Sequence, residues 1–142
     1  LGEDPDGESR TAISVGFTTQ DGRESTAIST HFSNGSSGAQ EAARVTQYEE
    51  LYDYTNDLDS AIVGGDFNSV PGGGYFDAQL AFESPWRDYP NPESGGLERS
   101  DDRDDIDHIL VGGEAGAAEG DNQLRGMGGS DHELELTEVT LG

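Results

Sequence analysis

The stretch Ala61–Pro71 constrains the fold of this chain more than any other. Small and apolar residues lead into Gly64-Gly65, and the polar residues Asp66 and Asn68 follow two positions apart. Because strand side chains repeat every second residue, the pattern predicts a short buried strand whose end carries both polar side chains on one face. Ligands of open α/β sheets bind at such strand ends. The structural alternative is an Asx turn, which Asp and Asn often form where a loop begins.

The rest of the chain alternates between strand and helix patterns. Arg10–Thr19 alternates like a half-buried strand, Gln20–Arg23 carries the Asp-Gly signal of a hairpin turn, and Ser25–Phe32 is the predicted partner strand. A helix is predicted over 39–58, with the buried stripe Ala42, Val45, Tyr48, Tyr52 and Thr55 and with Leu51 and Leu58 on its flank. After it, we predict a short helix over 75–82, a surface loop over 83–104 and a strand over 106–111. A loop to 122, a short strand over 123–127 and a final strand over 133–141 complete the chain.

The charge of the chain is strongly acidic. It has 30 Asp and Glu residues against 7 cationic ones, all Arg, for a net charge of −23 over 142 residues. Such a surface predicts a protein that works in very high salt, where repulsion is screened within about 3 Å. The cytoplasm of a salt-accumulating halophile and an external brine are both compatible. The alternative is an ordinary acidic protein with a poorly ordered surface.

Length and composition also bound the class of protein. The length predicts one domain over 1–142, and the strand and helix patterns argue against the disorder that 31% hydrophobic residues could indicate. There is no cysteine, hence no thiolate metal site. No run of about 18 apolar residues occurs, so we expect no membrane partner.

Histidines and acidic residues meet at predicted strand ends. His31 ends one strand, and two further pairs are Asp107-His108 and Asp131-His132. Alternation points Asp107 away from His108, so Asp107 is expected to orient a different histidine. Asp131-His132 reads either as a tight turn or as a metal ligand beside a group that titrates near neutrality. With no cysteine and many carboxylates, the predicted metal is Mg²⁺ or Mn²⁺.

Four blocks in order resemble the C-terminal signatures of the endonuclease/exonuclease/phosphatase family, which includes DNase I and exonuclease III. The blocks are Thr30-His31-Phe32, Gly65-Asp66-Phe67-Asn68, Ile106-Asp107-His108-Ile109 and Ser130-Asp131-His132, and Ala43-Arg44…Gln47 resembles the helix between the first two. The resemblance covers roughly residues 10–142. It implies an α/β fold, with a mixed, mainly antiparallel sheet and helices on one face, as in half of a DNase I-like four-layer sandwich.

The resemblance also implies roles for the site residues. Asp66 would align or deprotonate the attacking water, Asn68 would orient it and bind a phosphate oxygen, and His132 would contact the scissile phosphate. Asp107 would hold His132 in place, and His31 would contact the phosphate or assist the leaving group. Asp131, Asp66 and Asn68 would lie near the divalent metal. His108 would have a structural role.

The family has a further N-terminal half that supplies an Asn and the main metal-ligand Glu, and no such half precedes residue 10. We therefore expect an exposed apolar sheet face and a site that binds metal weakly unless Glu24, Glu133 or another carboxylate substitutes. The chain is then a fragment of a longer protein, a half-domain that forms a homodimer through that face, or a half-domain whose activity has decayed.

The function implied is a divalent-metal-dependent phosphodiester hydrolase, a nuclease acting on DNA in high salt. The net charge of −23 leaves no basic footprint for nucleic acid, although molar salt weakens that objection. The alternatives are a phosphatase or phosphodiesterase acting on lipid or small phosphoesters, and a non-catalytic assembly module.

Overall fold

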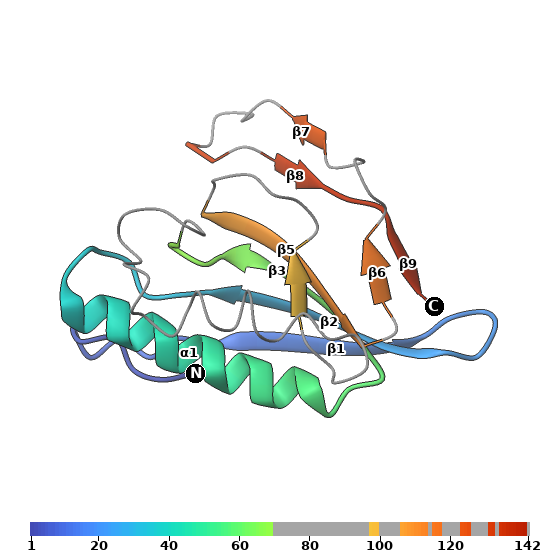
Figure 1. The fold of residues 1–142 in the computed structure, drawn as a ribbon, viewed down its shortest axis with the longest axis horizontal. Coiled ribbons are helices and arrows are strands. Elements are labelled where there is room, and N and C mark those ends of the chain that lie inside the picture. Colours follow the sequence, from blue (N-terminus) through green and yellow to red (C-terminus); the bar gives the residue numbers. More distant parts are fainter. Residues whose placement is uncertain are drawn as a thin grey trace.

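A five-stranded sheet with a long helix on one face forms the centre of the molecule (Figure 1). The computed structural model describes residues 1–69, 97–99, 106–113, 115–117, 123–125, 131–132 and 134–141. In spatial order, the strands of the sheet are β1 (Ala12–Thr18), β2 (Glu24–His31), β3 (Ser60–Asp66), β5 (Asp107–Gly113) and β4 (Leu97–Arg99). Strands β2 and β3 are parallel and the other neighbours are antiparallel, which confirms the predicted mixed, mainly antiparallel sheet.

The hairpin between β1 and β2 forms where the Asp-Gly signal predicted it. The Thr19 amide donates to the Arg23 carbonyl at 2.9 Å, and the Gly22 amide donates to the Thr19 carbonyl at 3.0 Å. Gly22 has a φ of 91°, in a region that glycine enters without the steric penalty of a Cβ atom. The turn chemistry therefore sets the register of the hairpin.

Helix α1 (Gly38–Asn56) begins at a capping box, in which Ser37 accepts from the Gln40 amide. The predicted helix is confirmed, but its predicted buried stripe is wrong in part. Ala42 is exposed, and the buried residues of α1 are Arg44, Gln47, Tyr48, Leu51 and Thr55. Polar residues occupy the buried face because their side chains bond the backbone that precedes the helix, which a pattern of apolar residues does not register.

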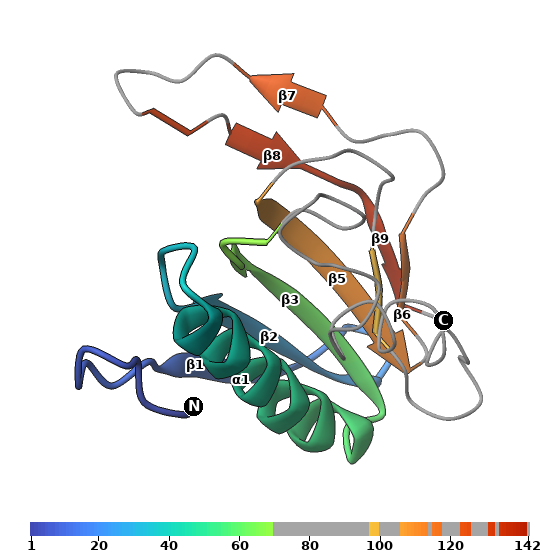
Figure 2. The ribbon, with the colours of Figure 1, turned by 60° about the vertical axis from the view of Figure 1, so that its left-hand side comes forward.

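The core lies between α1 and the face of the sheet that α1 covers (Figure 2). Its buried residues are Ile28, Phe32, Tyr48, Leu51, Ala61, Val63, Phe67, Leu97 and Leu110. The register places Ser14, Ile28, Val63 and Leu110 side by side on this inner face. Burial of this apolar surface is the main force that joins helix and sheet.

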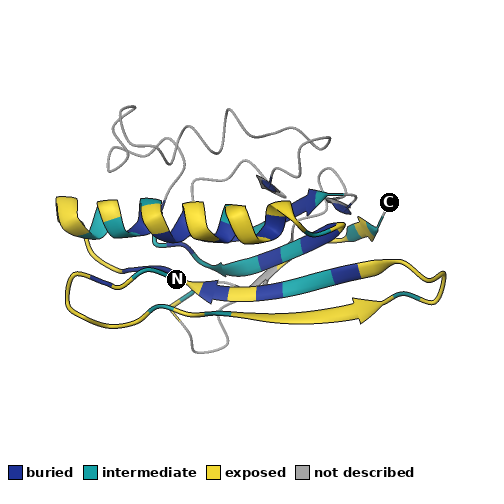
Figure 3. Ribbon diagram, turned by 90° about the horizontal axis from the view of Figure 1, so that it is seen from below, coloured by how far each residue is buried: buried dark blue, intermediate teal, exposed yellow. Residues whose placement is uncertain are grey.

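The outer face of the sheet is the face opposite α1, and strand β1 is uncovered there. Ile13, Val15 and Phe17 are 67%, 60% and 38% exposed. Figure 3 shows β1 exposed along nearly its whole length. The strand predicted over Arg10–Thr19 is confirmed, but its predicted half-burial is wrong, because β1 is an edge strand with little packed on either side. The exposed apolar sheet face expected from the family resemblance is confirmed for β1.

The C-terminal part adds two small ribbons. Strand β6 (Ala115–Ala117) pairs with β9 (Val139–Leu141), and β7 (Gln123–Arg125) pairs with β8 (Leu134–Leu136). The predicted single strand over 133–141 is divided because β8 and β9 have different partners. The loops predicted over 83–104 and up to residue 122 contain β4 and β6, since strands of three residues are too short to show periodicity.

The short helix predicted over 75–82 lies outside the described residues. Among those that are described, no helix is long and apolar enough to cross a membrane.

Candidate active site

Three neighbouring strands bring His31, Asp66 and Asp107 into one row at an end of the sheet. The register pairs His31 with Asp66 and Asp66 with Asp107. Because paired residues share a face, all three side chains project from the outer face. His31 Nε2 lies 3.4 Å from Asp66 Oδ2. The parallel pairing of β2 and β3 therefore assembles the first two members of the predicted site.

His132 reaches the same row from the C-terminal part of the chain. Its Nδ1 lies 2.6 Å from Asp107 Oδ2. Asp107 thus contacts a histidine other than its neighbour, as the alternation of the strand predicted. His108 points to the inner face, where it is buried and its Nε2 lies 2.9 Å from the Ser69 carbonyl oxygen.

The contact with Asp107 changes the acid–base behaviour of His132. The hydrogen bond to the Asp107 carboxylate, together with its negative charge, raises the pKa of His132 above its ordinary value. The charges of Asp66 and Asp131 act in the same direction. In the metal-free site, His132 therefore releases its proton at a higher pH than an isolated imidazole.

Asp66, Asp107 and His132 form a group that fits a divalent cation. Each offers a ligand atom, and these atoms all lie within 4.8 Å of one another. The side chains of the two aspartates are 17% and 25% exposed, so the group is open to solvent. Carboxylate oxygens are the ligands that Mg²⁺ and Mn²⁺ prefer. The chemistry of this donor set therefore fits the predicted metal.

The metal ligands expected from the sequence differ in part from this group. Asp131 is exposed and lies outside it, so its role near the metal stays a prediction. Glu24 is wrong as a substitute ligand, because it begins β2 whereas the site lies at the other end of that strand. Glu133 lies outside the described residues.

Asn68 is held at the site by two hydrogen bonds. Its backbone amide donates to Asp66 Oδ1 at 2.7 Å, and its side-chain Nδ2 donates to the Phe32 carbonyl at 3.0 Å. Its φ of 50° lies in the left-handed region, which asparagine tolerates better than most residues. The first bond is the Asx turn considered as the structural alternative, and this turn fixes the Asp66 carboxylate within the site.

Asp107 has a part that sequence reasoning missed. It was expected only to orient a histidine, yet it also belongs to the group that can hold a cation. The second role of Asp107 follows from the pairing of β3 with β5, which places Asp107 opposite Asp66. Nothing in the local pattern around residue 107 shows that pairing.

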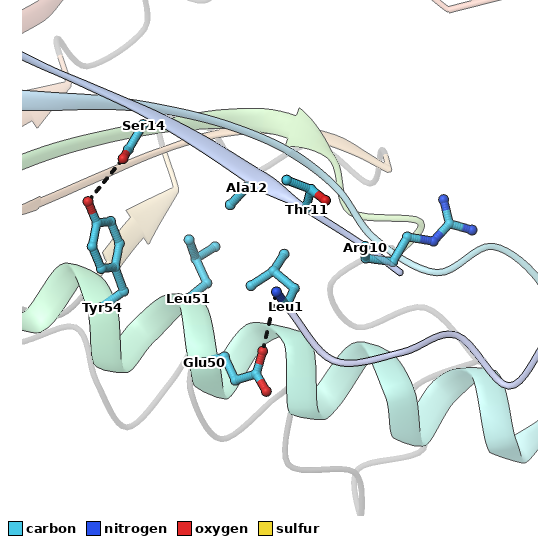
Figure 4. A pocket seen from close by; sticks show the side chains of 8 residues that line it. All are labelled: Leu1, Arg10, Thr11, Ala12, Ser14, Glu50, Leu51 and Tyr54. Atoms are coloured by element: carbon cyan, nitrogen blue, oxygen red, sulfur yellow. Dashed lines mark hydrogen bonds and ion pairs between the residues drawn. The ribbon is translucent and has the colours of Figure 1, made fainter. Parts of the chain in front are cut away.

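A pocket of about 290 Å³ lies elsewhere, between β1 and α1 (Figure 4). Within it, Tyr54 donates to Ser14 Oγ at 3.1 Å, and the Leu1 amino group lies 3.7 Å from Glu50. Ser14 belongs to the inner face of the sheet. The pocket is therefore on the other side of the sheet from the carboxylate row.

The chain has the fold of endonuclease/exonuclease/phosphatase structures, as its four sequence blocks predicted. It matches no family model and no curated protein sequence.

Three solved structures illustrate the likeness. An endonuclease/exonuclease/phosphatase protein from Bacteroides vulgatus matches with a TM-score of 0.65 and 19% identity over 100% of this chain and 59% of its own. A mannosyl-6-phosphatase from Bacteroides thetaiotaomicron gives 0.58 and 18%, over 92% and 57%. A Staphylococcus aureus beta toxin with bound magnesium ions gives 0.53 and 14%, over 97% and 57%. The chain thus spans little more than half of each.

Proposed function

We propose that this chain provides the catalytic residues of a divalent-metal-dependent phosphoester hydrolase. The observation that carries the proposal is the convergence of Asp66, Asp107 and His132 within 4.8 Å, with His31 beside Asp66. Among proteins of the same fold, one is named a phosphatase and another holds magnesium, which supports this reading. Carboxylates paired with histidines supply both cation ligands and proton-transfer groups.

Asp66 and Asp107 are the carboxylates that would hold the cation, with Asn68 and Asp131 as proposed further ligands. A bound divalent cation would neutralise phosphate charge and lower the pKa of its water. Asp66 Oδ1 accepts from the Asn68 amide, which leaves Oδ2, beside His31, to orient a water or accept its proton. His31 is placed to contact the phosphate or the leaving group.

His132 is the proposed acid at the scissile phosphate. Its Nδ1 is engaged by Asp107, so Nε2 is the atom that faces the substrate. Because its pKa is raised, His132 keeps its second proton to a higher pH than an isolated imidazole, and Nε2–H can donate to a phosphate oxygen or to the departing oxygen. Asp107 holds the ring orientation throughout.

For the substrate we propose DNA, cleaved in high salt. The net charge of −23 repels a polyanion at low ionic strength, and molar salt screens that repulsion. A lipid or small phosphoester is the second candidate, supported by the phosphatase among the structural neighbours.

A non-catalytic assembly module is the remaining candidate. The observation that favours it is the exposed apolar row of Ile13, Val15 and Phe17 on the same face of the sheet as the carboxylates. A partner protein bound to that face would lie next to the carboxylates. In that case the chain alone binds but does not turn over substrate.

The test is hydrolysis in about 2–3 M KCl, where surface charge is screened. Supercoiled plasmid, a small phosphodiester and a small phosphomonoester are each offered with Mg²⁺ or Mn²⁺, with EDTA as the blank. We expect metal-dependent hydrolysis that falls by about 10²- to 10⁴-fold in His132→Ala and Asp66→Ala. Asp53→Ala, an exposed acid on α1, is the matched control.

The pattern of results separates the candidates. Plasmid nicking identifies a nuclease, whereas turnover of the monoester alone identifies a phosphatase. Folded protein without hydrolysis of any substrate favours the assembly module. Wild-type rates in both site variants would show that the assignment of Asp66 and His132 is wrong.

A further inference from the structure

One peptide group behind the site is hydrogen bonded at both ends. The Phe32 carbonyl accepts from Asn68 Nδ2 at 3.0 Å, and the Ser33 amide, which belongs to the same peptide, donates to Gln47 Oε1 at 2.9 Å. A peptide group is planar and rigid, and in the trans form its N–H and C=O point in opposite directions. The Gln47 and Asn68 carboxamides are therefore linked through a single rigid unit.

Gln47 is itself held firmly. Its side chain is fully buried, and Nε2 donates to Ser33 Oγ at 2.7 Å and to the Gly2 carbonyl at 3.1 Å. One turn earlier on α1, Arg44 Nη1 donates to the carbonyls of Ser33 and Gly35 at 2.9 and 2.7 Å. The helix thus fixes the corner that joins β2 to α1.

The same corner is tied directly to the site. The Phe32 amide donates to the Asp66 carbonyl at 2.9 Å, while Asn68 Nδ2 returns to the Phe32 carbonyl. The Asn68 amide in turn donates to Asp66 Oδ1 at 2.7 Å. A continuous path of hydrogen bonds therefore leads from Gln47 to the Asp66 carboxylate.

We infer that Gln47 is a positioning residue, which orients the Asn68 carboxamide through the Phe32–Ser33 peptide and thereby the Asp66 carboxylate. Hydrogen-bonded amides polarise one another, so the Gln47 bond also strengthens the bond that Asn68 makes. Loss of a group that orients a site residue from behind typically lowers metal affinity or activity by about 10- to 100-fold. The catalytic importance of this arrangement rests on the proposed function, whereas the arrangement itself does not.

The test compares the same substitution at two glutamines of α1. Gln47→Met removes the Oε1 acceptor, together with the Nε2 donor, with little change in volume. Gln40→Met is the matched control, because among the described residues the Gln40 side chain bonds to Ser37 alone. The readout is the Asn68 side-chain NH₂ and backbone amide in ¹⁵N NMR spectra of metal-free protein. We expect both signals to shift and to exchange faster in Gln47→Met and to stay unchanged in Gln40→Met. Unchanged Asn68 signals in folded Gln47→Met would overturn the inference.

The reverse measurement covers the case in which Gln47→Met does not fold. Asn68→Gly removes the Nδ2 donor at a position whose positive φ suits glycine. The Ser33 amide, at the far end of the shared peptide, is then expected to shift. A Ser33 signal identical to that of the wild type would contradict the link between the two carboxamides.

Kinetics separates this inference from the proposed function. If the wild type hydrolyses a phosphoester, Gln47→Met is expected to lower kcat by about 10- to 100-fold with little change in KM, the range for loss of a supporting hydrogen bond. A structural glutamine without a positioning role would leave the kcat of the folded fraction intact. If the wild type hydrolyses nothing, the proposed function fails, and the NMR comparison still decides whether Gln47 orients Asn68.

Discussion

Nδ1 of His132 lies 2.6 Å from Oδ2 of Asp107, although 25 positions separate the two residues in the sequence. The contact joins the first residue of β5 to the C-terminal part of the chain. It completes a row that already contains His31 and Asp66. The acid–base chemistry of the site therefore depends on three strands and a distant segment holding one geometry.

The first prediction concerns the titration of His132. Asp107 favours the protonated ring, so Asp107→Asn is expected to lower the pKa of His132 toward the ordinary value of about 6.5. The stabilisation that this pair contributes is fully present below the unfolded-state pKa and is lost as the pH rises through the raised folded-state pKa. NMR titration of metal-free protein measures the shift. An unchanged His132 pKa in the variant would contradict the role of Asp107.

The second prediction concerns metal binding. Calorimetric titration with Mg²⁺ or Mn²⁺ should detect a site that weakens by at least about 10-fold in Asp66→Asn or Asp107→Asn, since loss of even a supporting group has that effect. Asp53→Asn on the helix surface serves as the control. Equal affinities in all four proteins would place the ion elsewhere.

The third prediction concerns the approach of β3 to β2. A Cβ atom at Gly65 would overlap the Thr30 carbonyl oxygen, whereas one at Gly64 would meet nothing within 4 Å. Gly65→Ala is therefore expected to lower the free energy of unfolding by about 1–3 kcal/mol, and Gly64→Ala by much less. Denaturant unfolding in high salt checks the difference. Equal stabilities would mean that the two strands separate at little cost.

The fourth prediction concerns the exposed outer face of β1. Ile13 and Val15 are more than half exposed, and we expect two copies to associate through them. Sedimentation in high salt should show a concentration-dependent dimer that Ile13→Thr with Val15→Thr abolishes, while the exposed helical variant Ala42→Ser retains it. A monomer at every concentration would instead point to another cover for this face.

The fifth prediction concerns salt. With a net charge of −23, the folded chain should be destabilised by self-repulsion at low ionic strength. The thermal midpoint is expected to rise as KCl increases from about 0.1 M to about 1 M, over which the screening length falls from about 10 Å to about 3 Å. A midpoint independent of KCl would argue against adaptation to high salt.

Local patterns predicted much of the fold correctly. The hairpin at Gly22, the helix that begins after Ser37 and the strand that ends at Asp66 all follow from short-range rules of turns, caps and periodicity. Short strands such as β4 and β6 were missed because three residues carry no period. The buried face of α1 was misplaced because Arg44 and Gln47 are buried by hydrogen bonds rather than by apolar character.

The sequence by itself determined which residues stand at strand ends, because alternation and turn chemistry act over a few neighbours. Asp66, Asn68 and the direction of Asp107 relative to His108 were all predictable on that basis. Only the tertiary structure decided that Asp107 lies opposite Asp66 and that His132 contacts Asp107. It also decided that the Gln47 and Asn68 side chains bond to the same Phe32–Ser33 peptide group. Those relations depend on strand order and on the docking of α1. Both are determined by contacts between residues that are far apart in the sequence.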